Sequence, residues 1–450
     1  MRTLPLLLLA LLSAAALPAQ QGTKGQQATQ LRQMEEKAKN DIRLLLEAAR
    51  FAKDKGFPKD QERILQKVIK LDPKNEEALR ALGFVKRGDQ WLPKAKAEAL
   101  EKADTEAEMK AKGMEWVDGV WVPKDAVADA KKGVFRHEGQ LVSKFEYRQF
   151  AAGKVRHPKT GMLIAKEDAE KAATQFQLPD GKWVSEDEAN KFHADVRTPW
   201  LLRTTYCNVL SNLPLADVLA TYKAPIDEGY ETVKQIFAGK EPSPARRPTV
   251  FITASVDEYK EFGTRFGAGG SAYGTFLADA DFDIPQLGGE FRVALVNHEK
   301  DWGAYWVRHA VGMSYAHALG AEGGVELPLW FVRGVGGFAE RFYTDGVAAH
   351  FGQQHIAKGG VPSMNSWFKV YDINGENEPK TNDALVFQAA FNIAFGMRGG
   401  DKQATAAMME ITNAFAKNGA AVVKAIGAYE KVLAEKEKEL RTYLQQITRK

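Results

Sequence analysis

Apolar residues recur at helical spacing near the start of the chain. Between positions 31 and 55 they fall three or four residues apart, and the same spacing returns between positions 61 and 71. Pro73 then interrupts the pattern, and a further apolar stretch runs from Ala78 to Phe84. The spacing predicts a helical segment over residues 30–86.

The residues around the break resemble the junction between tetratricopeptide repeats. Asp72-Pro73 ends one helix, and Leu82-Gly83-Phe84 supplies the leucine, glycine and aromatic residue that pack between helices in such repeats. Only about one and a half repeats are visible, whereas about three are needed for independent stability. The resemblance therefore implies a segment that caps or docks on another element.

Turn pairs containing glycine recur over residues 87–195. Each is followed by a bulky apolar residue in a short extended run and then by the start of an acidic, alanine-rich helix. The five runs are 88–93, 118–123, 138–142, 160–164 and 180–184. Glycine tolerates positive φ and so favours tight hairpin turns. The pattern predicts five hairpin-plus-helix units, with Trp91, Trp121 and Trp183 as buried miniature cores. The alternative is an exposed tryptophan row that binds a glycan or another surface polymer.

Residues 198–450 alternate a few extended runs with many helical ones. Strands are expected at 248–253, 275–277 and 291–296, with a helix at 255–262. The further expected helices are 302–319, 328–343, 382–395, 402–416 and 420–447. Strands followed by a run of helices indicate an α+β fold. We expect this segment to fold cooperatively by itself, because about 250 residues can hold a full core.

The N-terminus has the pattern of a secretory signal. One basic residue, Arg2, precedes an apolar run from Leu4 to Leu12, and small residues follow. The pattern predicts a signal peptide over residues 1–19 and a flexible lead-in over residues 20–29. We therefore expect an exported protein of the bacterial envelope, periplasmic or extracellular. The sequence has no second long apolar run, so we expect no transmembrane segment.

Composition narrows the classes of function. The 450 residues are 44% hydrophobic and 27% charged, with a net charge of +4, which does not favour nucleic acid as a partner. Cys207 is the single cysteine, so stability is expected from packed cores and not from a disulfide within the chain. The thiol is expected to be buried and inert.

Two neighbouring stretches carry the most specific signal. They run from Trp306 to Met313, with the sequence WVRHAVGM inside, and from Leu327 to Gly334, with the sequence LPLWFVRG. This part of the chain resembles gluzincin zinc metallopeptidases of the MA-like type. That family places His-Glu-x-x-His on one helix and a third zinc ligand, a glutamate, on a second helix entered through Pro-x-Trp-Phe-x-Glu-Gly. The resemblance covers roughly residues 245–450.

The resemblance implies a peptidase-like domain that has lost its chemistry. His309 stands at the first ligand histidine, Ala310 replaces the glutamate that acts as general base, and Met313 replaces the second histidine. Arg333 replaces the ligand glutamate, and its permanent charge repels a divalent ion. We therefore expect no zinc, no other cofactor and no catalytic residue.

A second register of the motif does not supply the missing carboxylate. Alignment on Gly337-Phe338-Ala339-Glu340 places Gly336 at the third ligand position. Trp330 and Glu340 complete the expected relic binding cleft with His309, Ala310, Met313 and Arg333. If the helix pair keeps the family geometry, the triple change Ala310→Glu, Met313→His and Arg333→Glu should restore zinc affinity.

Other metal sites are weaker alternatives. His317, His350 and His355 could regroup with His309 around a metal. Four acidic residues mimic the spacing of a calcium loop, but a solvated acidic loop is the simpler interpretation. These residues are Asp279, Asp281, Asp283 and Glu290.

Together these patterns predict an exported protein whose peptidase-like domain serves in binding or scaffolding, with a protein or peptide as partner. The alternatives are an active metallopeptidase with a non-standard metal site and an envelope module that binds a glycan or polymer. The patterns leave the oligomeric state open.

Overall fold

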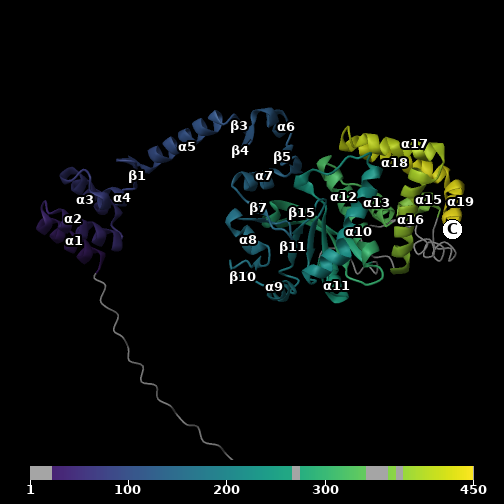
Figure 1. The fold of residues 1–450 in the computed structure, drawn as a ribbon, viewed down its shortest axis with the longest axis horizontal. Coiled ribbons are helices and arrows are strands. Elements are labelled where there is room, and N and C mark those ends of the chain that lie inside the picture. Colours follow the sequence, from purple (N-terminus) through teal and green to yellow (C-terminus); the bar gives the residue numbers. More distant parts are fainter. Residues whose placement is uncertain (1–22, 266–273, 341–362, 371–378, 449–450) are drawn as a thin grey trace, which may run out of the picture. The chain divides into compact units, whose positions relative to one another are not determined.

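The computed structural model describes residues 23–265, 274–340, 363–370 and 379–448 (Figure 1). It combines helices with small sheets, which confirms the mixed α+β class. The chain divides into two compact units, residues 1–125 and 126–450. This division falls inside the run of hairpin units and not at residue 195, where the sequence pattern changes.

The first unit begins with three helices around one apolar core. These are α1 (Lys24–Ala38), α2 (Ile42–Asp54) and α3 (Pro58–Leu71), and their core includes Leu31, Leu45, Ile64 and Val68. A capping box closes the start of α1, because the Thr23 side chain accepts from the Gln26 backbone and the Gln26 side chain returns a bond to Thr23. Residues 24–29 are therefore helical, and their assignment to a flexible lead-in is wrong.

The fourth helix departs from the repeat pattern. Helix α4 (Glu76–Ala81) has only six residues, and Leu82 forms its C-cap. Gly83 follows in the left-handed region with φ 79°, and Phe84 opens a strand. The Leu82-Gly83-Phe84 triplet, which carries the resemblance to a repeat, thus lies at a helix end and not within a helix.

The turn pairs lie in five antiparallel two-stranded hairpins. Two lie before residue 125: β1 (Phe84–Arg87) with β2 (Gln90–Pro93), and β3 (Met114–Val117) with β4 (Val120–Pro123). Helix α5 (Lys94–Ala111) connects them. The other three are β5 (Phe135–His137) with β6 (Gln140–Val142), β7 (Val155–Arg156) with β8 (Leu163–Ile164), and β9 (Phe176–Gln177) with β10 (Trp183–Val184).

A short helix follows each of the last four hairpins. These helices are α6 (Val127–Ala130), α7 (Lys144–Ala151), α8 (Ala169–Ala172) and α9 (Glu186–His193). In the second hairpin, Asp118 and Gly119 both adopt positive φ, 46° and 82°, as a tight two-residue turn requires. A pair of one polar residue and one glycine therefore lies in each of these turns, as the sequence indicates.

The tryptophans of the hairpins are not buried cores. Trp91, Trp121 and Trp183 are half-buried, and Trp116 is 57% exposed. The fully covered side chains of the hairpins are smaller residues, namely Val117, Val120, Val122, Phe135, Val142, Phe176 and Val184. The three predicted tryptophans are thus covered over most of their surface but are not fully enclosed, because the β-branched residues on the opposite strand face occupy the interior.

A five-stranded sheet forms the centre of the second unit. Its strands are β11 (Trp200–Arg203), β12 (Asn208–Ser211), β13 (Thr249–Thr253), β14 (Thr275–Ile284) and β15 (Gly289–Asn297), in the order β11-β12-β13-β15-β14. β12, β13 and β15 run parallel, and the two outer strands run antiparallel to their neighbours. The acidic residues of the possible calcium loop lie in β14 and β15, so they form a strand pair and not a loop.

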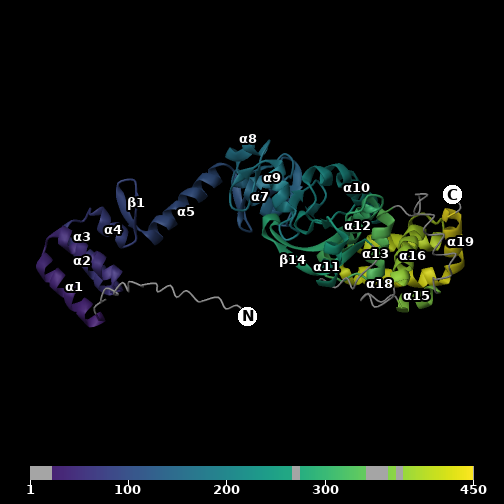
Figure 2. The ribbon, with the colours of Figure 1, turned by 90° about the horizontal axis from the view of Figure 1, so that it is seen from below.

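Alternate residues of the sheet enter two different cores. Val250 and Ile252 pack under α10 (Leu215–Ile236), α12 (Gly303–Glu322) and α13 (Leu329–Ala339). Phe251 faces the other side, which α11 (Val256–Arg265) covers. Figure 2 shows α11 beside β14, where the Tyr259 and Phe276 ring centroids are 5.4 Å apart. Both faces of this mixed sheet are thus covered.

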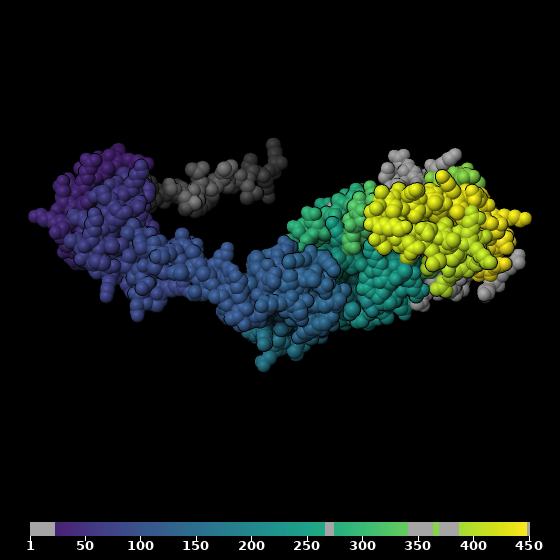
Figure 3. Space-filling model, turned by 90° about the horizontal axis from the view of Figure 1, so that it is seen from above, coloured from purple at the N-terminus to yellow at the C-terminus, as the bar shows by residue number. Residues whose placement is uncertain are grey.

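The remaining described helices form a bundle beside α13, and one of them packs extensively against it. They are α15 (Met364–Val370), α16 (Pro379–Arg398), α17 (Lys402–Ala414), α18 (Gly419–Glu435) and α19 (Glu437–Thr448). Helices α18 and α19 take the place of the single expected helix at 420–447, because the helix is interrupted at Lys436. The C-terminal helices, in yellow, form one continuous surface in Figure 3. None of the helices in the described ranges is both long enough and apolar enough to span a membrane.

The last three hairpin units pack directly on the sheet. Gly161 has φ 69° and lies against the backbone of Arg203, which leaves no room for a side chain. Phe176, Val184 and Ala189 belong to the same core as the helices over the sheet. These units are therefore part of the second compact unit, although their sequence pattern sets them apart.

Candidate functional site

Helices α12 and α13 carry the residues of the peptidase-like motif. His309, Ala310 and Met313 on α12 are completely buried, and Trp330 on α13 is 4% exposed. Arg333 is half-buried, and Glu340 directly follows α13 with no exposure. The two helices pack against each other, as the resemblance implies, but most of the expected cleft is closed by packing.

His309 faces a carboxylate that the motif does not predict at this position. Its Nδ1 lies 3.0 Å from Oε1 of Glu340, and both side chains are fully buried. Glu340 lies seven residues beyond Arg333, at the end of the facing helix. The structure thus brings His309 and Glu340 together, and their side chains contact each other directly.

The other side of the His309 ring is closed by glycine. A Cβ atom on Gly336 would lie 2.6 Å from Cδ2 and 2.8 Å from Nε2 of His309. A Cβ on Gly312 would lie 2.8 Å from the Cα of Gly336. The two helices therefore touch through glycine backbone at this crossing, and the imidazole fills the space beside it.

Arg333 lies close enough to His309 to influence its charge. Burial lowers the pKa of His309 well below its ordinary value, and the positive charge of Arg333 lowers it further. The Arg333 guanidinium reaches the sheet, where Nη1 donates to the Thr275 carbonyl at 3.0 Å. The proximity of His309 and Arg333 agrees with the sequence-based expectation, although burial and not Arg333 is the larger cause of the shift.

Trp330 takes part in packing around α18. Its Nε1 donates to Oε1 of Glu430 at 2.7 Å, and its ring packs edge-on against Trp367 and Phe368. The buried indole thus has its hydrogen-bond partner, as aromatic groups with a polar atom require in an interior. Trp330 anchors the C-terminal helices and does not line an open cleft.

These residues do not fit a zinc site. Zinc needs three protein ligands around one open point, and Nε2 of His309 lies against Gly336 while Nδ1 faces Glu340. Ala310 has no ligand atom, and Arg333 adds positive charge. Across the described ranges, no three His, Cys, Asp or Glu side chains form a group that could hold a metal ion.

The other metal candidates do not gather around His309. His317 lies on α12, and burial, together with Arg292 and Arg246, lowers its pKa to about 4. Asp281 makes an ion pair with Arg292, with Oδ1 at 2.6 Å from Nε. Asp283 lies opposite Glu290 across the β14–β15 pair. His350 and His355 fall outside the described residues.

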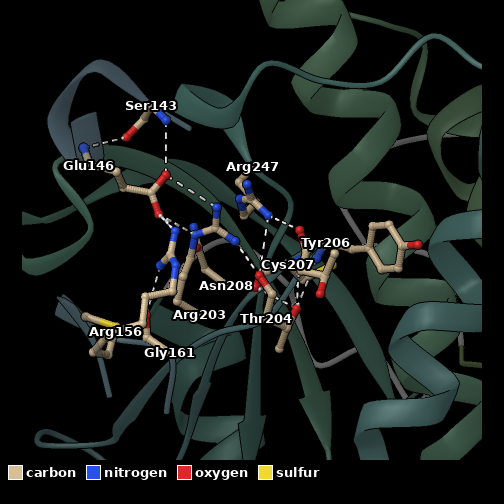
Figure 4. A network of polar contacts seen from close by, with 12 residues as sticks. Ser143, Glu146, Arg156, Gly161, Arg203, Thr204, Tyr206, Cys207, Asn208 and Arg247 are labelled. Carbon is tan, nitrogen blue, oxygen red and sulfur yellow. Dashed lines mark hydrogen bonds and ion pairs between the residues drawn. The ribbon is translucent and has the colours of Figure 1, made fainter. Parts of the chain in front are cut away.

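A second buried polar cluster lies at the other edge of the sheet, and sequence reasoning missed it. Glu146 of α7 accepts from Nε of Arg203 at 2.9 Å and from Nη2 of Arg156 at 3.0 Å (Figure 4). The Arg203 and Glu146 side chains are only 8% and 7% exposed. The capping box Ser143–Glu146 was the one available sequence signal, since it marks the start of α7.

The arginines and hydrogen bonds around Glu146 keep its carboxyl ionised. Burial alone would raise the pKa of Glu146, but the charge of Arg203 and the hydrogen bonds from Ser143, Arg203 and Arg156 outweigh it and lower the pKa to about 2. Nearby Cys207 is fully buried, and burial raises the pKa of its thiol to about 12. The thiol is therefore protonated at neutral pH, in agreement with an unreactive interior residue.

Comparison with known proteins does not identify a family: no protein-family model and no curated protein matches the chain.

Proposed function

We propose that this chain is an exported protein whose second unit is a non-catalytic, peptidase-like domain that binds a protein or peptide. The observation that carries the proposal is the enclosure of His309. The one ligand-type residue of the motif is packed between Gly336 and Glu340, so it can support the helix crossing but not bind a metal.

The exposed edge of the sheet supports a binding role. Within the described ranges β14 pairs only with β15, and its residues 279–283 are exposed or half-buried, so this part of the strand can accept a further strand. Asp279 and Asp283 are exposed on β14, whereas Asp281 is paired with Arg292. An extended peptide could add to such an edge through backbone hydrogen bonds. The charges favour a peptide with basic residues at alternate positions.

A peptide-binding experiment tests this proposal. Fluorescence anisotropy would compare a labelled peptide of alternating lysine and valine with its glutamate counterpart. We expect the full chain to bind the lysine peptide more tightly and to leave it intact, as checked by mass spectrometry. The double change Asp279→Lys and Asp283→Lys should weaken binding, whereas Glu410→Lys, at an exposed site on α17, should not. Equal binding of both peptides, or cleavage of either, contradicts the proposal.

Export is the remaining part of the proposal and rests on residues 1–19. N-terminal sequencing of the protein recovered outside the cytoplasm of its host should begin near Leu17 or Gln20. An intact Met1 on that protein would contradict export through a cleaved signal.

The tryptophan hairpins support a second candidate function, the binding of an envelope glycan. Trp116 is 57% exposed and packs edge-on against Trp121, with ring centroids 5.2 Å apart. An exposed indole supported by a second one is suited to stacking on a sugar ring. Titration with cell-wall material should change tryptophan fluorescence in the wild type and less so in Trp116→Ala. Unchanged fluorescence in the wild type would exclude this function.

A further inference from the structure

Guanidinium groups outnumber carboxylates at the amino ends of β12 and β13. Five arginines and three acidic residues lie in or beside this region of the second unit. They are Arg156, Arg203, Arg246, Arg247 and Arg292, with Glu146, Asp281 and Glu290. Glu146 is shared between Arg156 and Arg203, and Asp281 pairs with Arg292. On the side that faces α12, three of these arginines and two of the carboxylates lie together and keep a net charge of +1: Arg246, Arg247 and Arg292 with Asp281 and Glu290.

Arg247 has an unused hydrogen-bonding edge. Its Nη1 donates to the backbone carbonyls of Thr204 and Thr205, as Figure 4 shows in part. Its buried Nε has no hydrogen-bond partner among the described residues. Nε and Nη2 of an arginine form the fork that binds two oxygens of one carboxylate or phosphate. A buried donor without a partner is costly, so this edge is suited to a ligand.

A pocket lies beside this edge. It is lined by Arg246, Arg247 and Arg292, by the carboxylates Asp281 and Glu290, and by Ser314 and His317 from α12 on the opposite wall. Ser314 Oγ accepts from the Thr249 backbone, which leaves its hydroxyl hydrogen for a further acceptor. The walls thus present donors from three elements, the β13 entrance, β15 and α12.

We propose that this pocket binds the phosphoryl group of a small phosphorylated molecule. A phosphate carries close to two negative charges and three acceptor oxygens, which match the excess charge and the donors. Phe291 and Ala318 supply apolar wall for an organic remainder. The Arg247 fork holds two phosphate oxygens, and Arg246 and Ser314 reach the third. This site is separate from the His309 site, whereas Asp281 of β14 lies both in its wall and on the strand edge.

Calorimetric titration of the full chain tests the site with three probes: inorganic phosphate, glycerol 3-phosphate and acetate. We expect saturable binding of one phosphate per chain, tighter binding of glycerol 3-phosphate and weaker binding of acetate. Inorganic phosphate binding as tightly as glycerol 3-phosphate would show that free phosphate is the ligand. Sodium chloride at equal ionic strength, the control for general screening, should give no saturable heat. If phosphate does not saturate, or acetate binds equally well, the proposal is overturned.

Three variants locate the binding. Arg247→Lys keeps the charge but loses the fork, and should weaken phosphate binding about tenfold. Arg246→Gln, at an exposed position, should weaken binding without affecting the fold, and so tests the site even if Arg247→Lys is unstable. Arg32→Gln, an exposed arginine of the first unit, is the matched control and should bind as the wild type does. If all three variants bind equally, the phosphate lies elsewhere.

Discussion

Oε1 of Glu146 lies 2.9 Å from Nε of Arg203, although 57 residues separate them, and both side chains are less than a tenth exposed. This pair connects helix α7 of a hairpin unit with the first strand of the central sheet. A buried arginine depends on such a partner, because an uncompensated charge in an interior is strongly destabilising. Hairpin units and sheet therefore stabilise each other.

Glu146→Gln should lower the free energy of unfolding by roughly 3 kcal/mol at pH 7, because Arg203 stays buried without its counter-ion. Urea denaturation measures the change. Glu186→Gln breaks the exposed pair with Lys159 and serves as the control, with an expected loss below about 1 kcal/mol. Equal losses in both variants would show that the Glu146 pair contributes no more than a surface ion pair.

The same carboxyl predicts a pH dependence. The folded pKa of Glu146 is about 2, below its ordinary value, so its contribution is complete above pH 4.5 and is lost as the pH falls toward 2. The stability difference between the wild type and Glu146→Gln should therefore shrink over this range. Denaturation curves at pH 7, 4 and 3 measure it, and a constant difference would contradict the assignment.

The second unit should need its hairpin units in order to fold. A fragment of residues 126–450 should unfold cooperatively, whereas a fragment of residues 198–450 should be markedly less stable or insoluble. The shorter fragment loses Phe176, Val184 and Ala189 from the main core and leaves Arg203 without Glu146. Circular dichroism melting compares the two. A shorter fragment with an unchanged midpoint would restore the boundary near residue 195 that the sequence suggests.

Zinc affinity should not return when the missing ligands are supplied. The triple change Ala310→Glu, Met313→His and Arg333→Glu rebuilds the motif, but Gly336 and Glu340 still enclose both ring nitrogens of His309. Elemental analysis after dialysis against zinc should find no stoichiometric metal in this variant or in the wild type. One zinc per chain in the wild type, lost in His309→Gln, would show a working site.

Buried histidines should make the fold less stable below neutral pH. The pKa of His317 is about 4 when folded, below its ordinary value of 6.5, so the unfolded chain binds the proton first as the pH falls. Stability should decline by up to about 1.4 kcal/mol per pH unit for this histidine between pH 6.5 and 4. His317→Asn should reduce that slope, and His137→Asn, on a hairpin strand, is the matched control. Identical slopes in all three proteins would contradict the shift.

Local signals in the sequence predicted local structure well. The turn pairs lie in hairpins, and the expected helix at 302–319 corresponds to α12 at Gly303–Glu322. Helix α10 was not predicted, because Pro225 and Gly229 interrupt its pattern. Gly229 is needed where α10 crosses the Arg308 backbone, a reason that appears only when the two helices are packed.

For the candidate site, too, the sequence predicted the local motif but not the contacts between distant segments. The identity of His309, Ala310, Met313 and Arg333 was sufficient to predict that a zinc motif is incomplete. The contact of His309 with Glu340 depends on the crossing of α12 and α13, and the cluster around Arg203 depends on contacts between distant segments. Spacing along one helix contains no information about either arrangement.

The glycine contact between α12 and α13 has a consequence for mutational tolerance. Where two helices touch through backbone, a larger residue cannot adjust by rotating its side chain, so one helix has to shift. Saturation mutagenesis should therefore find Gly312 and Gly336 among the least replaceable positions of the chain, while the exposed Met409 accepts most residues. The constraint is one of backbone shape, and it would persist whatever ligand the protein binds.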